Sequence, residues 1–138
     1  MEEKEYDHVE AIFNGSNYIS TITANGNTIV SDEPESVGGL NKGFNPFELV
    51  IAGLASCTIA TIKMYLDRKG WVAESVNVKV QLETSDDSEP QITKNIQIKS
   101  DLEPDQLKRV FAVASKCPTH KLLSKGITIT SKLNDGVA

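Results

Sequence analysis

A long helix is predicted by residues 45–70, which read NPFELVIAGLASCTIATIKMYLDRKG. Asn45 can cap its first turn, Pro46 suits the first helical position and Gly70 suits the end of the helix. The stretch 49–62 contains no charged residue, so no side of this helix is adapted to water. One small domain has little material to cover a helix of roughly 35 Å. The sequence therefore suggests that a partner subunit supplies the missing cover.

Strands and shorter helices are predicted on both sides of this helix. Apolar–polar alternation and Asn-Gly turn signals place the strands, and Pro104, Pro118 and Gly126 bound the later helices. The expected strands are 6–13, 18–23, 28–30, 76–82, 92–98 and 127–133, with a polar turn over 84–90 and helices from 104 to 114 and from 118 to 125. This order predicts an α+β fold in a single domain, residues 1–138.

The charge distribution restricts the classes of partner. The chain has 138 residues, with 14 Lys and Arg against 19 Asp and Glu, and a net charge of −5. Such acidity argues against a nucleic-acid partner bound through its phosphates. The acidic start at residues 1–5 precedes no apolar signal segment, and the apolar stretch 49–62 is shorter than the roughly 20 residues that span a bilayer. We therefore expect a cytoplasmic protein with no membrane partner.

No cofactor or metal site is predicted. The glycine-rich stretch 31–45 lacks the spacing of the known phosphate-binding loops, so we expect a loop whose glycines adopt positive φ angles. A metal site is conceivable only from Cys57, Cys117, His120 and His8, which show none of the usual ligand spacings.

The two cysteines are the candidates for chemistry. Cys57 lies in the middle of the long helix, where residue type alone favours a buried and inert thiol. Cys117 can cap the helical turn that begins at Pro118, where backbone N–H groups and the helix dipole favour a thiolate. Five Lys or Arg and one acidic residue lie between residues 104 and 126, so local charge favours Cys117. His120 is either a surface histidine or a partner of the thiol.

Several short motifs in a fixed order resemble the OsmC/Ohr family of thiol-dependent hydroperoxide reductases. The resemblance covers nearly the whole chain. It rests on Asp32-Glu33-Pro34, Gly38-Gly39-Leu40-Asn41-Lys42-Gly43, Asn45-Pro46-Phe47-Glu48-Leu49, Ala55-Ser56-Cys57-Thr58, Met64-Tyr65, Arg68-Lys69-Gly70 and Cys117-Pro118-Thr119-His120.

This resemblance implies a fold, an assembly and a reaction. The fold has antiparallel sheets packed on two central helices in an intertwined homodimer, with active sites at the subunit interface. Cys57 would attack an organic hydroperoxide and become a sulfenic acid, and Cys117 would then form a disulfide with it. An external dithiol would reduce this disulfide.

Two positions depart from the family pattern. Family peroxidases hold the thiolate with an N-terminal arginine, whereas the first arginine here is Arg68; they also carry a glutamate where Phe47 stands. Glu48, Lys42 and His8 are candidates to replace these groups, and His120 is a further candidate for a supporting residue. Two hypotheses follow: a slow thiol peroxidase, or a non-enzymatic dimer that binds a small apolar ligand or senses redox state.

Overall fold

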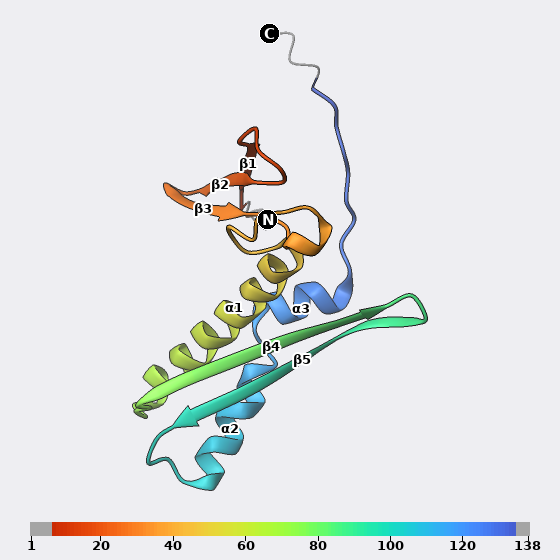
Figure 1. Cartoon of the computed structure of the whole chain (residues 1–138). Helices are drawn as coiled ribbons and strands as arrows, with labels where there is room; N and C mark the ends of the chain where they lie inside the picture. Colours follow the sequence, from red (N-terminus) through yellow and green to blue (C-terminus); the bar gives the residue numbers. More distant parts are fainter. Residues whose placement is uncertain (1–6, 135–138) are drawn as a thin grey trace, which may run out of the picture. The chain divides into compact units, whose positions relative to one another are not determined.

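The protein combines two antiparallel sheets with three α-helices, as the computed structural model of residues 7–134 shows (Figure 1). This arrangement confirms the predicted α+β class. The elements are β1 (Glu10–Phe13), β2 (Ser20–Ala24), β3 (Asn27–Ser31), a short 3-10 helix (Glu35–Val37), α1 (Pro46–Lys69), β4 (Ser75–Ser85), β5 (Ser88–Lys99), α2 (Pro104–Ala114) and α3 (Pro118–Lys125).

The chain divides into two compact units whose boundary lies inside α1, between Ala52 and Gly53. Each unit is described by itself. The single domain expected over residues 1–138 stays a prediction.

A three-stranded meander forms the sheet of the N-terminal unit, as the sequence predicts. Strand β2 lies between β1 and β3, and all pairs are antiparallel. Asn25 and Gly26 make the tight turn between β2 and β3, with φ angles of 50° and 81°. Positive φ at both positions matches the twist of a two-residue hairpin, which explains the Asn-Gly pair. The first strand was expected from residue 6, which lies outside the described residues.

A buried carboxylate organises the loop that follows β3. Asp32 is 1% exposed and accepts backbone N–H groups of Glu33 at 2.7 Å and of Leu40 and Lys42 at 3.1 Å each. Burial raises the pKa of this carboxyl group, while these hydrogen bonds and the charge of Lys42 lower it, and the net pKa is below its usual value. The Asp32 carboxylate therefore holds the backbone of this loop in place through hydrogen bonds.

The glycines of this loop serve two purposes. Gly38 has a φ of +96°, as expected for a loop that needs the left-handed region. Gly39 and Gly43 instead allow close backbone approach: an added Cβ would lie 1.9 Å from the Glu33 carbonyl oxygen and 2.1 Å from that of Val30. The expectation of positive φ thus explains only part of the glycine content.

Helix α1 begins and ends where the sequence predicts. The Asn45 side chain accepts the N–H of Glu48 at 2.8 Å, and the Glu48 carboxylate accepts the N–H of Asn45 at 2.8 Å. This reciprocal pair is a capping box. Pro46 is the first helical residue, and Gly70, with a φ of 69°, ends the helix.

Only one stripe of α1 is buried within the C-terminal unit. The stripe comprises Leu54, Thr58, Ile62 and Leu66, which recur every four residues. Residues on the opposite side, such as Ala60, are exposed. The complete burial predicted for 49–62 is thus absent within the single chain, and cover by a partner stays a prediction.

The length and composition of α1 would also suit a membrane span. The helix has 24 residues, a mean hydropathy of 1.7 in its most apolar window and 22% of that window buried. The expectation that its apolar stretch is too short for a bilayer is therefore not supported by length alone. One such helix is weak evidence for a span, because a long core helix passes the same test.

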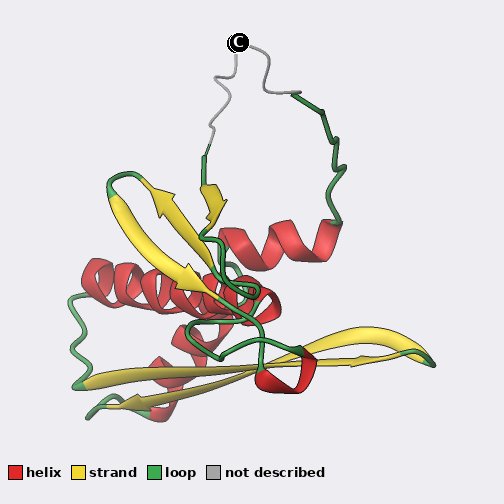
Figure 2. Ribbon diagram, turned by 45° about the horizontal axis from the view of Figure 1, so that its top comes forward, coloured by secondary structure: helices red, strands yellow, loops and turns green. Residues whose placement is uncertain are grey.

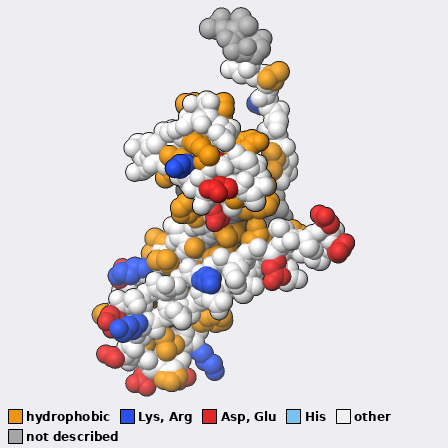
Figure 3. All heavy atoms as spheres, viewed as in Figure 1, with side chains coloured by type: hydrophobic (Ala, Val, Ile, Leu, Met, Phe, Trp, Pro, Cys, Tyr) orange, Lys and Arg blue, Asp and Glu red, His pale blue; other side chains and the backbone are white. Residues whose placement is uncertain are grey.

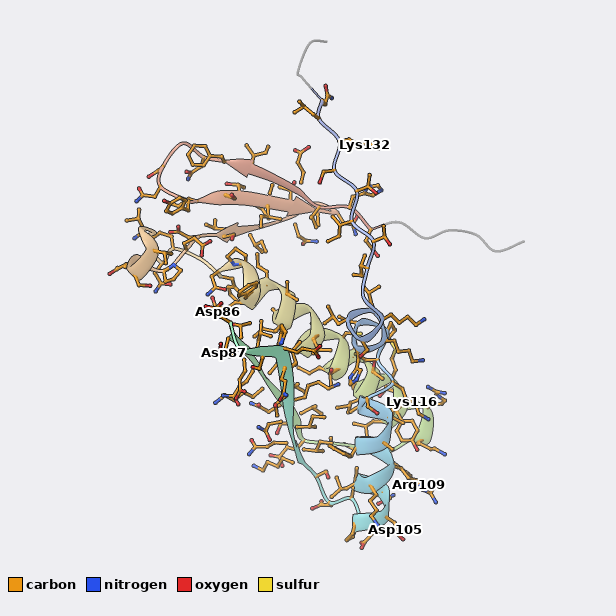
Figure 4. The ribbon with its side chains drawn as sticks, turned by 90° about the vertical axis from the view of Figure 1, so that its right-hand side faces the viewer. Asp86, Asp87, Asp105, Arg109, Lys116 and Lys132 are labelled. Atoms are coloured by element: carbon orange, nitrogen blue, oxygen red, sulfur yellow. The ribbon has the colours of Figure 1, made fainter. Side chains whose placement is uncertain are left out.

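Strands β4 and β5 form one long antiparallel hairpin (Figure 2). The predicted turn over 84–90 is too long: the strands continue to Ser85 and resume at Ser88, so only Asp86 and Asp87 make the turn (Figure 4). The register shifts beside this turn, and Pro90 falls within the irregular stretch. Such an irregularity tolerates a residue that lacks a backbone N–H.

The core of the C-terminal unit lies between α1, α2 and the hairpin. Its buried members are Ile62 and Leu66 from α1 and Val110 and Ala114 from α2. Helices α2 and α3 begin at Pro104 and Pro118, as predicted. Phe111 shares the apolar helical spacing of Leu107, Val110 and Ala114, but it is 66% exposed.

The last predicted strand, 127–133, is wrong. This segment has no regular secondary structure, and Ile129 and Leu133 are 85% and 94% exposed. A strand needs a neighbouring strand to satisfy its backbone groups. Among the described residues no such neighbour pairs with this segment.

Candidate active site

Cys57 lies on α1 at the border between its buried stripe and its exposed side, and its thiol is half-buried. Burial raises the pKa of this thiol. Hydrogen bonds from the hydroxyl and backbone N–H of Thr119, and from the side chains of Cys117 and Thr61, lower it. The hydrogen bonds outweigh burial, so the pKa of Cys57 lies below its usual value. Residue type alone suggested an inert buried thiol, whereas the structure shows a partly accessible thiol with a stabilised thiolate.

Cys117 is the N-cap of α3, as the sequence predicts. Its sulfur accepts the backbone N–H of His120 at 3.2 Å, and Pro118 follows as the first helical residue. The residue is 0% exposed. A thiol so enclosed can be reached by a neighbouring side chain, but not by a bulky molecule from solvent.

The fold brings the two thiols together although 59 residues separate them in the sequence. The Cys117 side chain lies close enough to Cys57 to lower the pKa of its thiol, and Thr119, two residues later, lowers it further through its hydroxyl and its backbone N–H. The end of α2 and the start of α3 thus present Cys117 and the donors of Thr119 to one side of α1. Neighbouring thiols are the arrangement that a disulfide requires.

A buried polar layer lies behind Cys117. The Thr58 hydroxyl lies 2.8 Å from the Leu54 carbonyl oxygen and 3.8 Å from Cys117 Sγ. Lys94, from β5, donates to Thr58 Oγ1 at 3.2 Å and to the Ala114 carbonyl oxygen at 2.9 Å. These bonds join the sheet, α1 and the end of α2 around the Cys117 sulfur.

The predicted supporting residues lie in different places. His120 is half-buried beside Cys117 and donates its backbone N–H to the Cys117 sulfur, while its buried Nδ1 has no hydrogen-bond partner in the described part of the chain. Lys42 and Glu48 belong to the N-terminal unit, where Lys42 donates its N–H to Asp32 and Glu48 completes the helix cap. Their suggested part at Cys57, and that of His8, stays a prediction.

No group of three or more His, Cys, Asp or Glu that could hold a metal ion occurs within residues 7–134. The groups that lower the pKa of the Cys57 thiol are those of Thr119, Cys117 and Thr61.

Sequence reasoning gave no role to several residues of the site. Thr61 follows Cys57 by one helical turn, and this spacing is a usable signal. The sequence singled out Thr119 only as part of the Cys-Pro-Thr-His motif. Its place in the first turn of α3 leaves its backbone N–H without a partner inside the helix. Lys94 and Thr58 carry no sequence signal, because their contact depends on how β5 packs on α1.

Comparison with known proteins identifies the family. The family model described as OsmC-like protein matches residues 39–132. The chain belongs to the OsmC-like family. This match confirms the resemblance carried by the sequence motifs. Among curated proteins, no sequence matches this OsmC-like chain.

Solved structures share the OsmC-like fold. An OsmC-like protein from Mycoplasma pneumoniae aligns with a TM-score of 0.74 and 22% identity over 88% of this chain and 89% of that chain. The organic hydroperoxide resistance protein OsmC from Legionella pneumophila aligns with a TM-score of 0.63 and 19% identity over 87% and 90%. The organic hydroperoxide resistance protein OhrB of Bacillus subtilis aligns with a TM-score of 0.58 and 20% identity over 85% and 89%. These likenesses establish the fold.

Proposed function

We propose that this OsmC-like protein reduces organic hydroperoxides with the Cys57/Cys117 pair. The observation that carries the proposal is the half-buried Cys57 thiol, whose pKa is lowered by Thr119, Cys117 and Thr61, with the Cys117 thiol as its neighbour. Two fold relatives are named as organic hydroperoxide resistance proteins, which agrees with this chemistry. The protein is proposed to act in the cytoplasm.

The reaction proceeds in three balanced steps. The Cys57 thiolate attacks one oxygen of the hydroperoxide, the O–O bond breaks, and an alcohol leaves after taking up a proton. Cys57 is then a sulfenic acid. The Cys117 thiol attacks its sulfur, so a disulfide forms and water leaves. An external dithiol reduces the disulfide by two electrons and becomes a disulfide itself.

The rate is expected to be modest. The causes that lower the pKa of Cys57 are hydrogen bonds from hydroxyl, thiol and amide groups, and no arginine precedes Arg68. A charge-assisted contact contributes roughly 1.5–3 kcal/mol, or about ten- to a hundredfold in rate. We therefore expect slower thiolate attack than in a relative that holds the thiolate with an arginine.

Single-turnover reaction with cumene hydroperoxide, followed by reduction with a dithiol, tests the proposal. Cys57→Ser should abolish peroxide consumption. Cys117→Ser should consume one equivalent and stop at a sulfenic acid, which mass spectrometry and dimedone labelling detect. The reverse pattern would exchange the two roles, and no turnover in the unmutated protein would refute the proposal.

The active form is proposed to be a homodimer. The exposed side of α1 carries small residues such as Ser56 and Ala60, which permit close helix approach. Residues 127–133 are also unpaired, with Ile129 and Leu133 exposed, and they suit pairing with a second chain. Hydrophobic side chains are visible on the outer surface of the chain (Figure 3).

Sedimentation at micromolar concentration tests this assembly. Ala60→Arg should shift the protein from dimer to monomer, because a long charged side chain would separate the two α1 helices. Gln97→Arg adds the same charge at an exposed position of β5 and should leave the dimer intact. A monomeric unmutated protein would contradict the assembly.

The second candidate function is a dimer that binds a small apolar ligand or senses redox state without turnover. The observation that favours it is Phe47 in place of the family glutamate, together with the lack of an N-terminal arginine. Sustained consumption of cumene hydroperoxide with excess dithiol would exclude it. Reversible formation of the disulfide without turnover would favour redox sensing.

A further inference from the structure

The C-terminal unit contains a cavity that neither cysteine lines. Its volume is 490 Å³, within the range of about 300–1,000 Å³ typical of small-molecule sites. Apolar side chains make most of its wall and come from the hairpin, from α1 and from α2 and α3. The lining residues are Leu54, Pro90, Ile92, Lys94, Ile96, Phe111, Ala114, Ser115, His120, Leu123 and Ser124.

Lys94 gives this apolar cavity a cation. Its side chain is half-buried and donates to Thr58 Oγ1 at 3.2 Å and to the Ala114 carbonyl oxygen at 2.9 Å. An ammonium group has three N–H donors, so one remains after these two bonds. Within the described part of the chain no ion pair includes Lys94, and no Asp or Glu lines the cavity.

A half-buried cation without a counter-ion favours an anionic ligand. Both acceptors of Lys94 are uncharged, so they satisfy hydrogen bonds but do not neutralise the ammonium. A bound carboxylate would supply the missing charge and accept the third N–H group. An aliphatic or aromatic chain packed against Ile92, Phe111 and Leu123 would meanwhile remove these apolar walls from water.

We propose that this cavity binds an amphipathic monocarboxylate, with its head on Lys94 and its apolar tail along Ile92, Phe111 and Leu123. Because Cys57 and Cys117 do not line the cavity, the ligand needs no peroxide group, and its binding does not depend on the proposed peroxidase reaction. Lys94 sets the preference for an acid over a neutral molecule of the same length.

Calorimetric titration of the reduced protein with decanoate, at concentrations below those at which decanoate forms micelles, tests the site. We expect saturable binding of one decanoate per chain. Decanol, which has the same chain length without the charge, should bind at least tenfold more weakly. A hydrogen-bonded charge contact of the usual strength predicts that Lys94→Met weakens decanoate binding by roughly ten- to a hundredfold.

Matched variants separate this site from the fold and from the cysteine chemistry. Lys79→Met removes an exposed lysine of β4 outside the cavity and should bind decanoate as the unmutated protein does. Phe111→Ser changes an exposed wall residue and should weaken decanoate and decanol alike. Cys57→Ser should retain decanoate binding, which distinguishes failure of this proposal from failure of the peroxidase proposal.

Three results would overturn the inference: no saturable decanoate binding, equal binding of decanol, or unchanged binding in Lys94→Met. The first result refutes the proposed ligand whatever else fills the cavity, including a second copy of the chain. Circular dichroism of each variant ensures that a loss of binding does not reflect unfolding. If Lys94→Met unfolds, the comparison of decanoate with decanol in the unmutated protein remains as the test. Tighter binding of decanoate supports a charge contact in the cavity, and equal binding refutes it.

Discussion

Replacing Thr119 by valine should make Cys57 less acidic and less reactive. The Thr119 hydroxyl is the first of the hydrogen bonds that lower the pKa of this thiol, after burial, which raises it. Valine has nearly the same shape but cannot donate. The backbone N–H of residue 119 and the bonds from Cys117 and Thr61 remain. The thiolate is therefore weakened rather than lost.

The size of the effect follows from the strength of one hydrogen bond to a charged acceptor. Such a bond contributes roughly 1.5–3 kcal/mol, and about 1.4 kcal/mol corresponds to a factor of ten. Cys57 is half-buried and keeps its other donors, so we take the lower end of this range. Thr119→Val should then contain about tenfold less Cys57 thiolate at any pH below the thiol pKa.

Alkylation with iodoacetamide between pH 5 and pH 9, with the labelled cysteine assigned by mass spectrometry, measures this change. The pH profile of Cys57 alkylation should shift to higher pH in Thr119→Val. Thr119→Ser keeps a hydroxyl and should restore most of the original profile. Thr93→Val removes an exposed threonine of β5 and is the control. An unshifted profile in Thr119→Val, or a shifted one in Thr119→Ser, would refute the reasoning.

Three further predictions concern stability. Ile62 is 0% exposed in the core, so Ile62→Ala should lower the free energy of unfolding in urea by about 2–5 kcal/mol. A smaller loss would mean that the core collapses into the space left by the removed side chain. The lowered pKa of Asp32 means that its stabilising effect is present above its unfolded pKa and lost as pH falls through the folded pKa. Asp32→Asn should reduce this acid dependence and speed amide exchange at Leu40, as followed by NMR. Gly39→Ala should lower the melting temperature, because its Cβ would lie 1.9 Å from the Glu33 carbonyl oxygen; an unchanged melting temperature would contradict this contact.

The parts of the fold set by neighbouring residues could be predicted from the sequence. The ends of α1 depend on Asn45, Pro46 and Gly70, which act within one helical turn. The same holds for the Asn25-Gly26 turn. The hairpin turn was placed too broadly, because the polar stretch 84–90 lacks a sharp signal and the strand pairing extends through it to Ser85 and Ser88.

The last strand failed for a different reason. Residues 127–133 have the alternation of a half-buried strand, but alternation does not supply a partner. Backbone hydrogen bonds decide whether an extended segment is a strand, and the described residues of one chain leave this segment without them. A second chain is the partner that the proposed dimer would provide.

At the site, features that depend on neighbouring residues could be predicted from the sequence, whereas contacts between distant segments could not. Cys117 could be recognised as an N-cap because Pro118 follows it directly. The donors of Thr119 to Cys57 could not, because they depend on packing α3 against α1 across about 60 residues of sequence. Local charge therefore pointed to Cys117 as the better thiolate, whereas the bonds that the fold assembles lower the pKa of Cys57.

Exposure and acidity together assign different tasks to the two thiols in the proposed reaction. A peroxide with an organic group must reach the attacking sulfur from outside, and Cys57 is half-buried whereas Cys117 is 0% exposed. The pKa of this accessible thiol is lowered, so access and thiolate character coincide at Cys57. Cys117 has no need of access from solvent, because its target is the sulfur of Cys57 itself. An intramolecular attack between preplaced groups has a high effective concentration, so the enclosed position of Cys117 is compatible with the resolving step.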